Sequence, residues 1–408
     1  MEFITWVYLF YMFIALYFLS LFTLTYLQNK KYFFSYPEIK KHFSISVLIP
    51  AYNEEECIEG TVESILSSDY DNIKEIIIIN DGSKDKTQEI AKKLEDKYEK
   101  VILFDKTNSG KADSLNQAIK IAKGELIAVV DADSYPSHKS FSQMVGFFEE
   151  EGVAAVTTRI LVRNPKKFIQ KLQEIEYMVI AFSRKLLGFL DAIYVTPGPL
   201  AIYDKHVLIK VGGFDTYNLT EDIEITWRLS FEGYKIRMSY PASSTSVSPS
   251  TLKAWFKQRL RWNIGGMQTI SKYKKNFFRK GMFGFFILPF FVFSLFLGIL
   301  GLGIFSYRVF RRFLLNYLSA FYSFDSNTSL FLIQDINLHP SILHFFGVTL
   351  FVLGFAFIFV AIYSVNKDLG KTASFLDVIF YSIIYMTLYP FVLIFSLCKF
   401  LKGGKYSW

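Results

Sequence analysis

Four long apolar runs divide the chain and leave one long polar segment between the first run and the second. The runs cover Ile4–Tyr26, Met282–Phe305, Ile342–Val365 and Phe375–Cys398. As a helix, the first run would be roughly 34 Å long at about 1.5 Å per residue, which is enough to cross a bilayer. Between residues 29 and 280 no apolar run reaches that length. The pattern therefore predicts a multi-pass membrane protein with a large polar domain between its first two spans.

A cleavable signal peptide is the alternative interpretation of the first run. Signal peptides begin with basic residues and end in a small-residue cleavage site. Here Glu2 stands where a basic residue would, the run is too long, and no such cleavage site follows. A membrane span therefore fits the sequence better.

Basic residues beside the runs predict which side of the membrane the polar domain occupies. Lys30 and Lys31 follow the first run, and the second is preceded by Lys272, Lys274, Lys275, Arg279 and Lys280. Because basic flanks stay in the cytoplasm, we expect the polar domain on the cytoplasmic face of the plasma membrane. Three later spans would place the C-terminus outside, together with Arg308, Arg311, Arg312, Lys399, Lys402 and Lys405. Basic residues favour the cytoplasmic side, so they conflict with this placement. An alternative is that one of the later runs is re-entrant or interfacial.

Within the polar segment, short runs rich in β-branched residues alternate with amphipathic helical stretches. Strands are predicted at Ser46–Ala51, Glu75–Asn80, Val101–Phe104 and Leu126–Val130, and helices at Ile58–Leu66, Lys84–Tyr98 and Gly110–Lys123. This alternation is typical of βαβ units and of a parallel sheet covered by helices on both faces. We therefore expect an α/β nucleotide-binding fold.

Composition and charge narrow the classes of function. Of the 408 residues, 51% are apolar and 18% aromatic, too apolar for a disordered or wholly soluble chain. A net charge of +8 suits anionic lipid or a phosphate-bearing substrate. Nucleic acid is not favoured as a partner, because the basic residues gather beside the apolar runs rather than on a groove-reading motif. With only Cys57 and Cys398, a disulfide framework and a thiolate zinc site are excluded.

Polar clusters follow three of the predicted strands. They are Asn53-Glu54-Glu55, Asp81-Gly82-Ser83 and Asp131-Ala132-Asp133. One such cluster is more often a turn or a helix cap, but ligands of open parallel sheets bind outside the carboxyl ends of the strands. Three clusters at one edge therefore favour a binding site. The motifs of dinucleotide and P-loop sites are missing, so those ligands are not favoured.

The types of residue in these clusters indicate the chemistry. Asp131 and Asp133 lie two residues apart in an extended segment and point to one side, so both can bind one cation or one ribose. Oxygen ligands suit Mg²⁺ or Mn²⁺, usually completed by substrate phosphates. Lys111 begins a predicted helix, where the ammonium and the helix N-terminus both favour anions. The alternative for Lys111 is an ordinary surface lysine.

The segment TEDIEITWRL, residues 220–229, carries a further candidate. Thr220 could cap a helix with Glu221 and Asp222 in its first turn. Alternatively, Asp222 is a general base that takes a proton from an attacking hydroxyl. The aspartate pair upstream favours the second interpretation.

The segment TLKAWFKQRLRW, residues 251–262, predicts an amphipathic helix at a lipid surface. Its apolar stripe is Leu252, Trp255, Phe256 and Leu260, beside the basic residues Lys253, Lys257, Arg259 and Arg261. Gln258 and Arg261 share a face at a spacing of three residues, so both could hold a diphosphate. Trp262 offers a flat apolar surface to a sugar ring.

Together these motifs resemble the membrane-embedded processive β-glycosyltransferases of family two. That family includes cellulose, chitin and hyaluronan synthases, and the motifs look most similar to bacterial poly-N-acetylglucosamine synthases. The matching strings are VLIPAYNEE, NDGSKD, SGKADSLNQAI, DADS, TPGPLAIY, GGFD, TEDIEITWRL and TLKAWFKQRLRW. The resemblance implies a GT-A nucleotide-sugar domain inserted between transmembrane helices. Its implied segments are an N-terminal helix (1–28), the transferase domain (29–250), interfacial helices (251–281) and a C-terminal membrane region (282–408).

The resemblance also implies roles for individual residues. Asp222 matches the catalytic base, and Asp131 and Asp133 match the pair that binds the donor and a metal, Mg²⁺ or Mn²⁺. The implied substrate contacts are Asn53, Asp81 beside uracil, Lys111 near the nucleotide, Asp131, Glu221, Gln258 and Arg261 at the diphosphate, and Trp262 under the acceptor sugar. Residues 196–199 would form a loop near the acceptor. Asn80 departs from the family pattern, where many members carry a second aspartate.

The implied function is inverting, processive transfer of a sugar from a UDP-sugar to the growing end of an exported polysaccharide. N-acetylglucosamine is the leading candidate for the sugar. Membrane lipid and a small accessory membrane subunit are further possible partners. The first alternative is non-processive transfer to a polyprenyl-phosphate or lipid acceptor. The second is a non-catalytic sugar-binding or transport protein, which would need intramembrane charges that the four runs almost lack.

Overall fold

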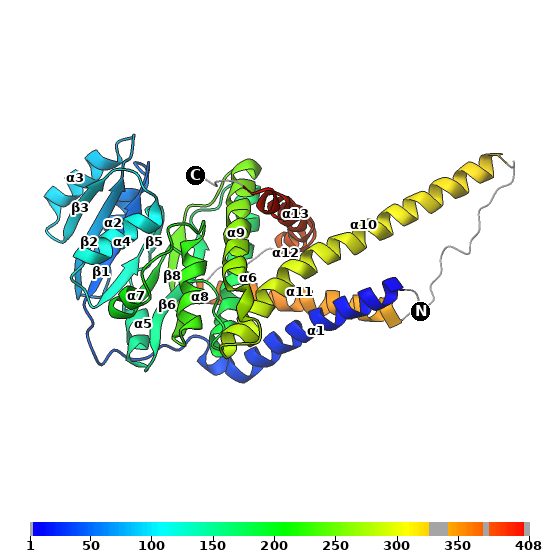
Figure 1. Cartoon of the computed structure of the whole chain (residues 1–408), viewed down its shortest axis with the longest axis horizontal. Coiled ribbons are helices and arrows are strands. Elements are labelled where there is room, and N and C mark those ends of the chain that lie inside the picture. Colours follow the sequence, from blue (N-terminus) through cyan, green and yellow to red (C-terminus); the bar gives the residue numbers. More distant parts are fainter. Residues whose placement is uncertain (1–2, 326–341, 370–374, 404–408) are drawn as a thin grey trace.

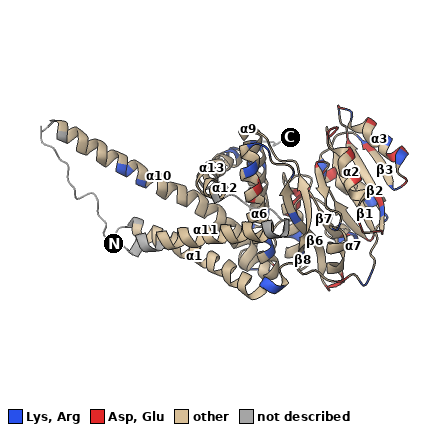
Figure 2. Ribbon diagram, turned by 180° about the vertical axis from the view of Figure 1, so that it is seen from behind, with Lys and Arg blue, Asp and Glu red and all other residues tan. Residues whose placement is uncertain are grey.

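The computed structural model describes residues 3–325, 342–369 and 375–403. Figure 1 shows an α/β domain at one end of the molecule and long helices extending from the other. Helices α6 and α9 lie between these two parts. Figure 2 shows that charged residues are concentrated in the α/β domain and are few along the long helices. The polar and apolar segments of the sequence are therefore separated in space.

One mixed sheet forms the centre of the α/β domain. The strand order in the described residues is β3-β2-β1-β4-β7-β6-β8-β5. The strands are β1 (Ile45–Ala51), β2 (Ile73–Asp81), β3 (Val101–Lys106), β4 (Leu126–Val129), β5 (Ser134–Pro136), β6 (Val153–Val162), β7 (Ala201–Asp204) and β8 (Lys235–Ser246). The four predicted strands, β1 to β4, pair in parallel, which confirms that part of the prediction.

The second half of the sheet departs from the parallel pattern. Strand β7 runs antiparallel to both β4 and β6, and β5 runs antiparallel to β8. Antiparallel neighbours need no helical crossover of fixed length. The regular alternation that reveals the first four strands is therefore absent here.

The helices of the domain cover both faces of the sheet. They are α2 (Ile58–Leu66), α3 (Thr87–Lys97), α4 (Lys111–Ile121), α5 (Ser142–Val145), α6 (Phe168–Phe189), α7 (Lys205–Lys210) and α8 (Glu221–Phe231). In β2, Ile76 and Ile78 belong to the core on the α3 side of the sheet, whereas Ile77 and Ile79 belong to the core on the α4 side. Successive strand residues point to opposite faces, so a wholly apolar strand requires helices on both sides.

Four helical segments of the described residues are long and apolar enough to cross a membrane. They consist of α1 (Phe3–Asn29), α10 (Leu288–Asp325), α11 (Ile342–Leu369), and α12 (Phe375–Phe380) with α13 (Met386–Lys402). A π-helical turn, Tyr381–Tyr385, joins α12 to α13, and another, Phe283–Ile287, precedes α10. The segments coincide with the four predicted runs, although α10 continues well past the expected end at Phe305. Lys405 lies outside the described residues.

Helices α6 and α9 (Leu252–Tyr273) attach the α/β domain to the long helices. On α6, the ring centroid of Phe182 lies 5.2 Å from that of Tyr26 in α1 and 5.5 Å from that of Phe357 in α11. On α9, the ring centroid of Phe256 lies 5.4 Å from that of Phe395 in α13. Helix α9 includes the predicted amphipathic segment but is longer. The functional motifs on α8 and α9 are thereby held at the junction of the two parts.

Candidate active site

The loops that follow β1 and β2 are joined at the carboxyl edge of the sheet. Asn53 adopts a left-handed backbone conformation with φ 56°. Its backbone N–H donates to Ser83 Oγ at 3.0 Å, and its side-chain Oδ1 accepts from the N–H of Lys84 at 2.8 Å. The predicted substrate residue Asn53 thus lies at the expected edge and positions the loop after β2.

Asp81 holds the loop that leads into α4. Its carboxylate accepts from Lys106 Nζ at 2.6 Å and from the backbone N–H groups of Ser109 and Gly110 at 2.9 and 2.8 Å. Gly110 has φ 93°, a conformation that favours glycine. These bonds fix the start of α4, where Lys111 is the first residue. The uracil contact of Asp81 stays a prediction, since both of its oxygens already have protein partners.

Lys111 brings together two motifs that are far apart in the sequence. Its Nζ lies 2.6 Å from Asp131 Oδ1 and 2.8 Å from Glu221 Oε1. Burial alone would lower the pKa of Lys111, but the two carboxylates outweigh burial and raise it. The same ion pair holds the pKa of Glu221 below its ordinary value, against the opposing effect of burial. Lys111 is therefore a permanent cation at the site.

The loop at residues 196–199 closes over this ion pair. The backbone N–H of Asp131 donates to the carbonyl of Gly198 at 3.0 Å. A Cβ atom on Gly198 would lie 2.4 Å from Asp131 Oδ2 and 2.7 Å from Lys111 Nζ. Only glycine lets the backbone approach both groups this closely.

Carboxylates crowd the space beside this loop. Burial, followed by the charge of Asp131, raises the pKa of Asp133 to about 6. Burial, followed by Asp133 and Asp131, raises the pKa of Glu54 to about 7. Like charges that lie close together in a buried site repel one another, and a cation bound there would reduce this repulsion. Glu54 is a site residue that the sequence analysis noted only as part of a polar cluster.

The described residues contain no group of three or more His, Cys, Asp or Glu side chains placed to enclose a metal ion. Asp131 and Asp133 would therefore supply only part of a coordination shell. Mg²⁺ is typically held by one or two carboxylates, with substrate phosphates and water as the other ligands. The oxygen-only pair and its mutual repulsion fit a cation that binds together with a diphosphate.

Asp222 follows Glu221 at the start of α8. Burial, followed by the adjacent charge of Glu221, raises the pKa of Asp222 to about 6, while Lys111 and Arg261 act in the opposite direction. Its Oδ1 accepts from the N–H of Ile223 at 2.9 Å. The charge of Arg261, on α9, acts to lower the pKa of both acids. The structure thus brings Asp131, Lys111 and Glu221 into contact, with Asp222 next to Glu221 and within the electrostatic influence of Arg261.

Thr220 occupies the N-cap position of α8, but its hydroxyl does not cap the helix. The hydroxyl instead donates to Asn218 Oδ1 at 3.2 Å. A Cβ atom on Gly265 of α9 would lie 2.2 Å from Thr220 Oγ1. The interpretation of Thr220 as a side-chain cap is therefore wrong, because its side chain packs against the backbone of α9.

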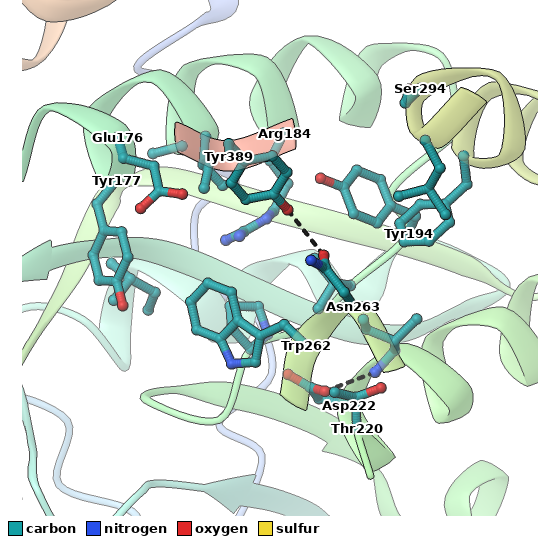
Figure 3. A pocket seen from close by; sticks show the side chains of 18 of the residues that line it. Glu176, Tyr177, Arg184, Tyr194, Thr220, Asp222, Trp262, Asn263, Ser294 and Tyr389 are labelled. Carbon is teal, nitrogen blue, oxygen red and sulfur yellow. Dashed lines mark hydrogen bonds between the residues drawn. The ribbon is translucent and has the colours of Figure 1, made fainter. Parts of the chain in front are cut away.

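A cavity of about 360 Å³ opens beside Asp222, at the junction with the long helices. Figure 3 shows Asp222 and Trp262 on one side and Glu176, Tyr177 and Arg184 from α6 on the other. Further lining residues come from the loop before β7 and from α10 and α13: Tyr194, Pro197, Pro199, Phe290, Phe291, Ser294 and Tyr389. The wall is largely aromatic with a few polar groups, a composition that suits carbohydrate rings. The cavity includes Trp262 and residues of the predicted loop at 196–199, whereas its residues on α6, α10 and α13 carry no signal in the sequence.

Trp262 is held at the cavity by a buried ion pair. The guanidinium of Arg259 lies 4.0 Å from the centroid of the Trp262 ring and pairs with Glu176 of α6. Arg259 is fully buried. The expectation that Arg259 lies with Lys253, Lys257 and Arg261 on the basic side of an interfacial helix is therefore wrong, since Glu176 supplies a buried partner that a single-helix pattern does not reveal.

Gln258 contacts α6. Its Oε1 accepts from Gln173 Nε2 at 3.0 Å, and Gln173 also donates to Tyr177 at 3.1 Å. This bond aligns α9 with α6. The diphosphate contact of Gln258 stays a prediction.

Comparison with known proteins identifies relatives of the domain. Residues 46–212 match the sequence model of Glycosyl transferase family 2. A poly-beta-1,6-N-acetyl-D-glucosamine synthase of Staphylococcus aureus (strain COL) is 33% identical over 258 residues, which cover 63% of this chain and 62% of the synthase. The synthase of Staphylococcus epidermidis is 35% identical over 228 residues, or 55% of each chain. The match thus spans less than two thirds of either relative.

A solved structure resembles nearly the whole chain. It is a mannosyltransferase from Pyrobaculum calidifontis in complex with GDP-Man and Mn²⁺. It superimposes with a TM-score of 0.60 over 97% of this chain and 98% of the other, at 18% sequence identity. At that identity the likeness concerns the fold. Together with the sequence match, it identifies residues 46–212 as a glycosyltransferase family 2 domain with the GT-A fold.

Proposed function

We propose that this protein is a membrane-embedded glycosyltransferase that transfers a sugar from a nucleotide-sugar donor to a carbohydrate acceptor. One observation carries the proposal. Asp222 lies between the charged cluster of Lys111, Asp131 and Glu221 and an aromatic cavity that reaches the long helices. A base between a donor-type anion site and a carbohydrate-type cavity is the arrangement that glycosyl transfer requires.

The donor is a nucleoside diphosphate sugar, with UDP-N-acetylglucosamine as the leading candidate. Lys111 and Arg261 supply positive charge for the diphosphate. Asp131 and Asp133 would hold Mg²⁺ or Mn²⁺, and the metal would neutralise the charge of the leaving diphosphate. Asn53, Asp81, Glu221 and Gln258 are proposed to position the donor and its surrounding loops. The named relatives support N-acetylglucosamine as the sugar.

The proposed reaction is a single displacement with inversion at the anomeric carbon. Asp222 accepts the proton of the acceptor hydroxyl, while the oxygen of that hydroxyl forms the new bond to the anomeric carbon. The bond from that carbon to the diphosphate oxygen breaks, and the nucleoside diphosphate leaves with the electron pair. General-base assistance of this kind contributes about 10²- to 10⁴-fold. Positioning and charge stabilisation by Lys111 and Arg261 supply further acceleration.

The acceptor is proposed to be a growing polysaccharide that lies in the aromatic cavity. Trp262 would stack on its terminal sugar, and the cavity wall formed by α10 and α13 would lead the chain toward the membrane helices. This arrangement suits processive synthesis of an exported polymer at the cytoplasmic face. The basic flanks at residues 30–31 and 272–280 support that orientation.

A panel of radiolabelled UDP-sugars tests the proposal on the purified full-length protein with Mg²⁺ or Mn²⁺. We expect UDP release with UDP-N-acetylglucosamine and a polymeric product. A single sugar on a polyprenyl phosphate would instead support the non-processive alternative. The variant Asp222→Asn should lose about 10²- to 10⁴-fold in turnover while still binding UDP. Asp71→Asn, an exposed aspartate elsewhere on the domain, serves as the matched control. If Asp222→Asn retains full turnover, the proposed base is wrong.

A further inference from the structure

Arg184 on α6 is a buried guanidinium for which the described residues provide no ion-pair partner. Its side chain makes one hydrogen bond there, from Nη1 to the carbonyl of Thr158 at the long distance of 3.5 Å. Its Nε has no partner. Arg184 is only 6% exposed, so water offers little compensation. Such a group is costly to bury unless something pairs with it.

The neighbouring Arg259 shows how the same fold neutralises a buried arginine. Arg259 is as deeply buried as Arg184, but it pairs with Glu176 and stacks on Trp262. Both arginines are near one cavity. Arg184 lines it and forms no ion pair in the described residues, although the charge of Asp222 on the same wall acts on it. Figure 3 shows the Arg184 side chain among the groups that line this space. The donors of Arg184 are therefore available to an occupant of the cavity.

The charges and rings of the cavity indicate which occupant suits it. Asp222 and Glu176 both line the wall, and of the two only Glu176 is paired with an arginine in the described residues, so a phosphate beside Arg184 would also face the charge of Asp222. A neutral sugar avoids this repulsion, since its hydroxyl groups donate to carboxylates and accept from a guanidinium. The aromatic side chains Trp262, Tyr177 and Tyr389 offer faces to sugar rings. The observations favour an uncharged carbohydrate over a lipid phosphate.

We propose that Arg184 determines acceptor specificity by donating hydrogen bonds to a hydroxyl or amide-carbonyl oxygen of a neutral sugar bound in the cavity. The inference rests on the proposed function and adds the residue that recognises the acceptor. In the described residues, no hydrogen bond or ion pair links Arg184 to the donor cluster of Lys111, Asp131 and Glu221. Its loss should therefore affect acceptor binding without affecting donor binding.

Steady-state kinetics of the full-length protein test this assignment. The probe acceptor is an oligosaccharide of β-1,6-linked N-acetylglucosamine, with the active UDP-sugar as donor. Arg184→Met should raise the KM for the oligosaccharide about 10- to 100-fold, the range expected for a lost hydrogen bond to a charged group. The KM for the donor and the slow release of UDP without acceptor should stay unchanged. Arg184→Lys should restore part of the acceptor affinity, because it keeps one charged donor.

Arg237→Met is the matched control, because Arg237 pairs with Glu150 and Asp191 outside the cavity. It should leave the KM for the oligosaccharide unchanged. Thermal unfolding with and without the oligosaccharide gives a second readout, and the shift seen with wild type should disappear in Arg184→Met. If Arg184→Met does not fold, Arg184→Lys and Arg184→Gln carry the same comparison.

The outcomes separate this inference from the proposed function. An unchanged acceptor KM and an unchanged thermal shift in a folded Arg184 variant would overturn the inference alone. A variant that loses transfer to polyprenyl phosphate but retains transfer to the oligosaccharide would overturn it in favour of a phosphate ligand. Absence of UDP release by the wild type with every UDP-sugar would instead overturn the proposed function.

Discussion

The ionisation of Asp222 predicts a pH below which activity falls, which we call the acid limit. Burial and the charge of Glu221 raise the pKa of Asp222 to about 6. A general base must be ionised, so it acts above this pKa and is protonated below it. We expect kcat/KM to fall about tenfold per pH unit below roughly pH 6. This prediction is checked by measuring UDP release between about pH 4.5 and about pH 8, a range that brackets the pKa of Asp222.

Two variants assign the acid limit to Asp222. Arg261 stabilises the ionised carboxylate, so Arg261→Gln should move the limit to higher pH as well as weaken donor binding. Glu54 titrates nearby with a pKa of about 7, but Glu54→Gln should leave the limit at the same pH. If the acid limit of activity shifts in Glu54→Gln and not in Arg261→Gln, the group that titrates is Glu54 rather than Asp222.

At the scale of single residues, the sequence predicted the acids and cations of the site, but of its hydrophobic side only Trp262 and the loop at residues 196–199. Asp131, Lys111, Glu221 and Asp222 stand in short motifs whose order fixes their positions at strand ends and helix starts. Arg184 lies in a mainly apolar stretch of α6, and Tyr389 lies in an apolar run, where neither spacing nor composition marks a site. Their roles depend on how α6, α9 and α13 pack together, which is a tertiary property.

The packing of α9 against α8 predicts the effect of a single methyl group. The backbone of Gly265 approaches Thr220 so closely that a Cβ atom would lie 2.2 Å from its hydroxyl oxygen. Gly265→Ala must displace the start of α8, which carries Glu221 and Asp222. We expect a loss of about 1–3 kcal/mol in stability, typical of overpacking, together with reduced turnover. Thermal unfolding and UDP release measure the two effects.

Gly303→Ala is the control for this substitution. Gly303 lies in α10, and an added Cβ atom would have no neighbour within 4 Å in the described structure. Alanine also has a higher helix propensity than glycine. Turnover should therefore be unchanged in Gly303→Ala. Equal effects of the two substitutions would contradict the proposed role of the α8–α9 contact.

At the scale of elements, hydrophobic periodicity predicted the strands and helices of the repeating βαβ units, but not the elements that follow the last unit. The βαβ alternation gave β1 to β4 and α2 to α4 within a few residues. The antiparallel strand β7 is only four residues long and follows a loop, so it carries no periodic signal. The sequence of α9 alone predicts a helix at the lipid surface. It does not reveal that Glu176 of α6 pairs with Arg259 and that Arg259 is therefore buried.

At the scale of the whole molecule, the arrangement of helices favours three spans. Figures 1 and 2 show α1, α10 and α11 extending away from the α/β domain, whereas α13 lies next to α9. Polar contacts attach α13 there: Asn263 donates to Ser396 at 3.2 Å and accepts from Tyr389 at 3.1 Å. Hydropathy alone predicts α13 as a fourth span, because its length and composition are those of one.

A three-span arrangement also removes the conflict of Lys399 and Lys402 with the positive-inside rule, whereas Arg308, Arg311 and Arg312 lie on the outer side with three spans or four. If α13 rests at the inner interface, Lys399 and Lys402 lie on the same side as the α/β domain. Arg308 follows the start of α10 by about 20 residues, or about 30 Å along a helix, which is the thickness of the hydrocarbon core. It would then reach the outer headgroups, together with Arg311 and Arg312. Basic side chains are tolerated at that depth, because they extend to the interface.

Cysteine labelling tests this topology in cells that express the full-length protein. Cys398 lies near the end of α13 and is exposed. In a Cys57→Ser background, we expect a membrane-impermeant maleimide to label it only after the cells are permeabilised. In cysteine-free protein, Lys93→Cys on the α/β domain should behave in the same way, and Tyr322→Cys near the far end of α10 should be labelled in intact cells. Labelling of Cys398 in intact cells, with Lys93→Cys still protected, would mean that α13 crosses the membrane as a fourth span.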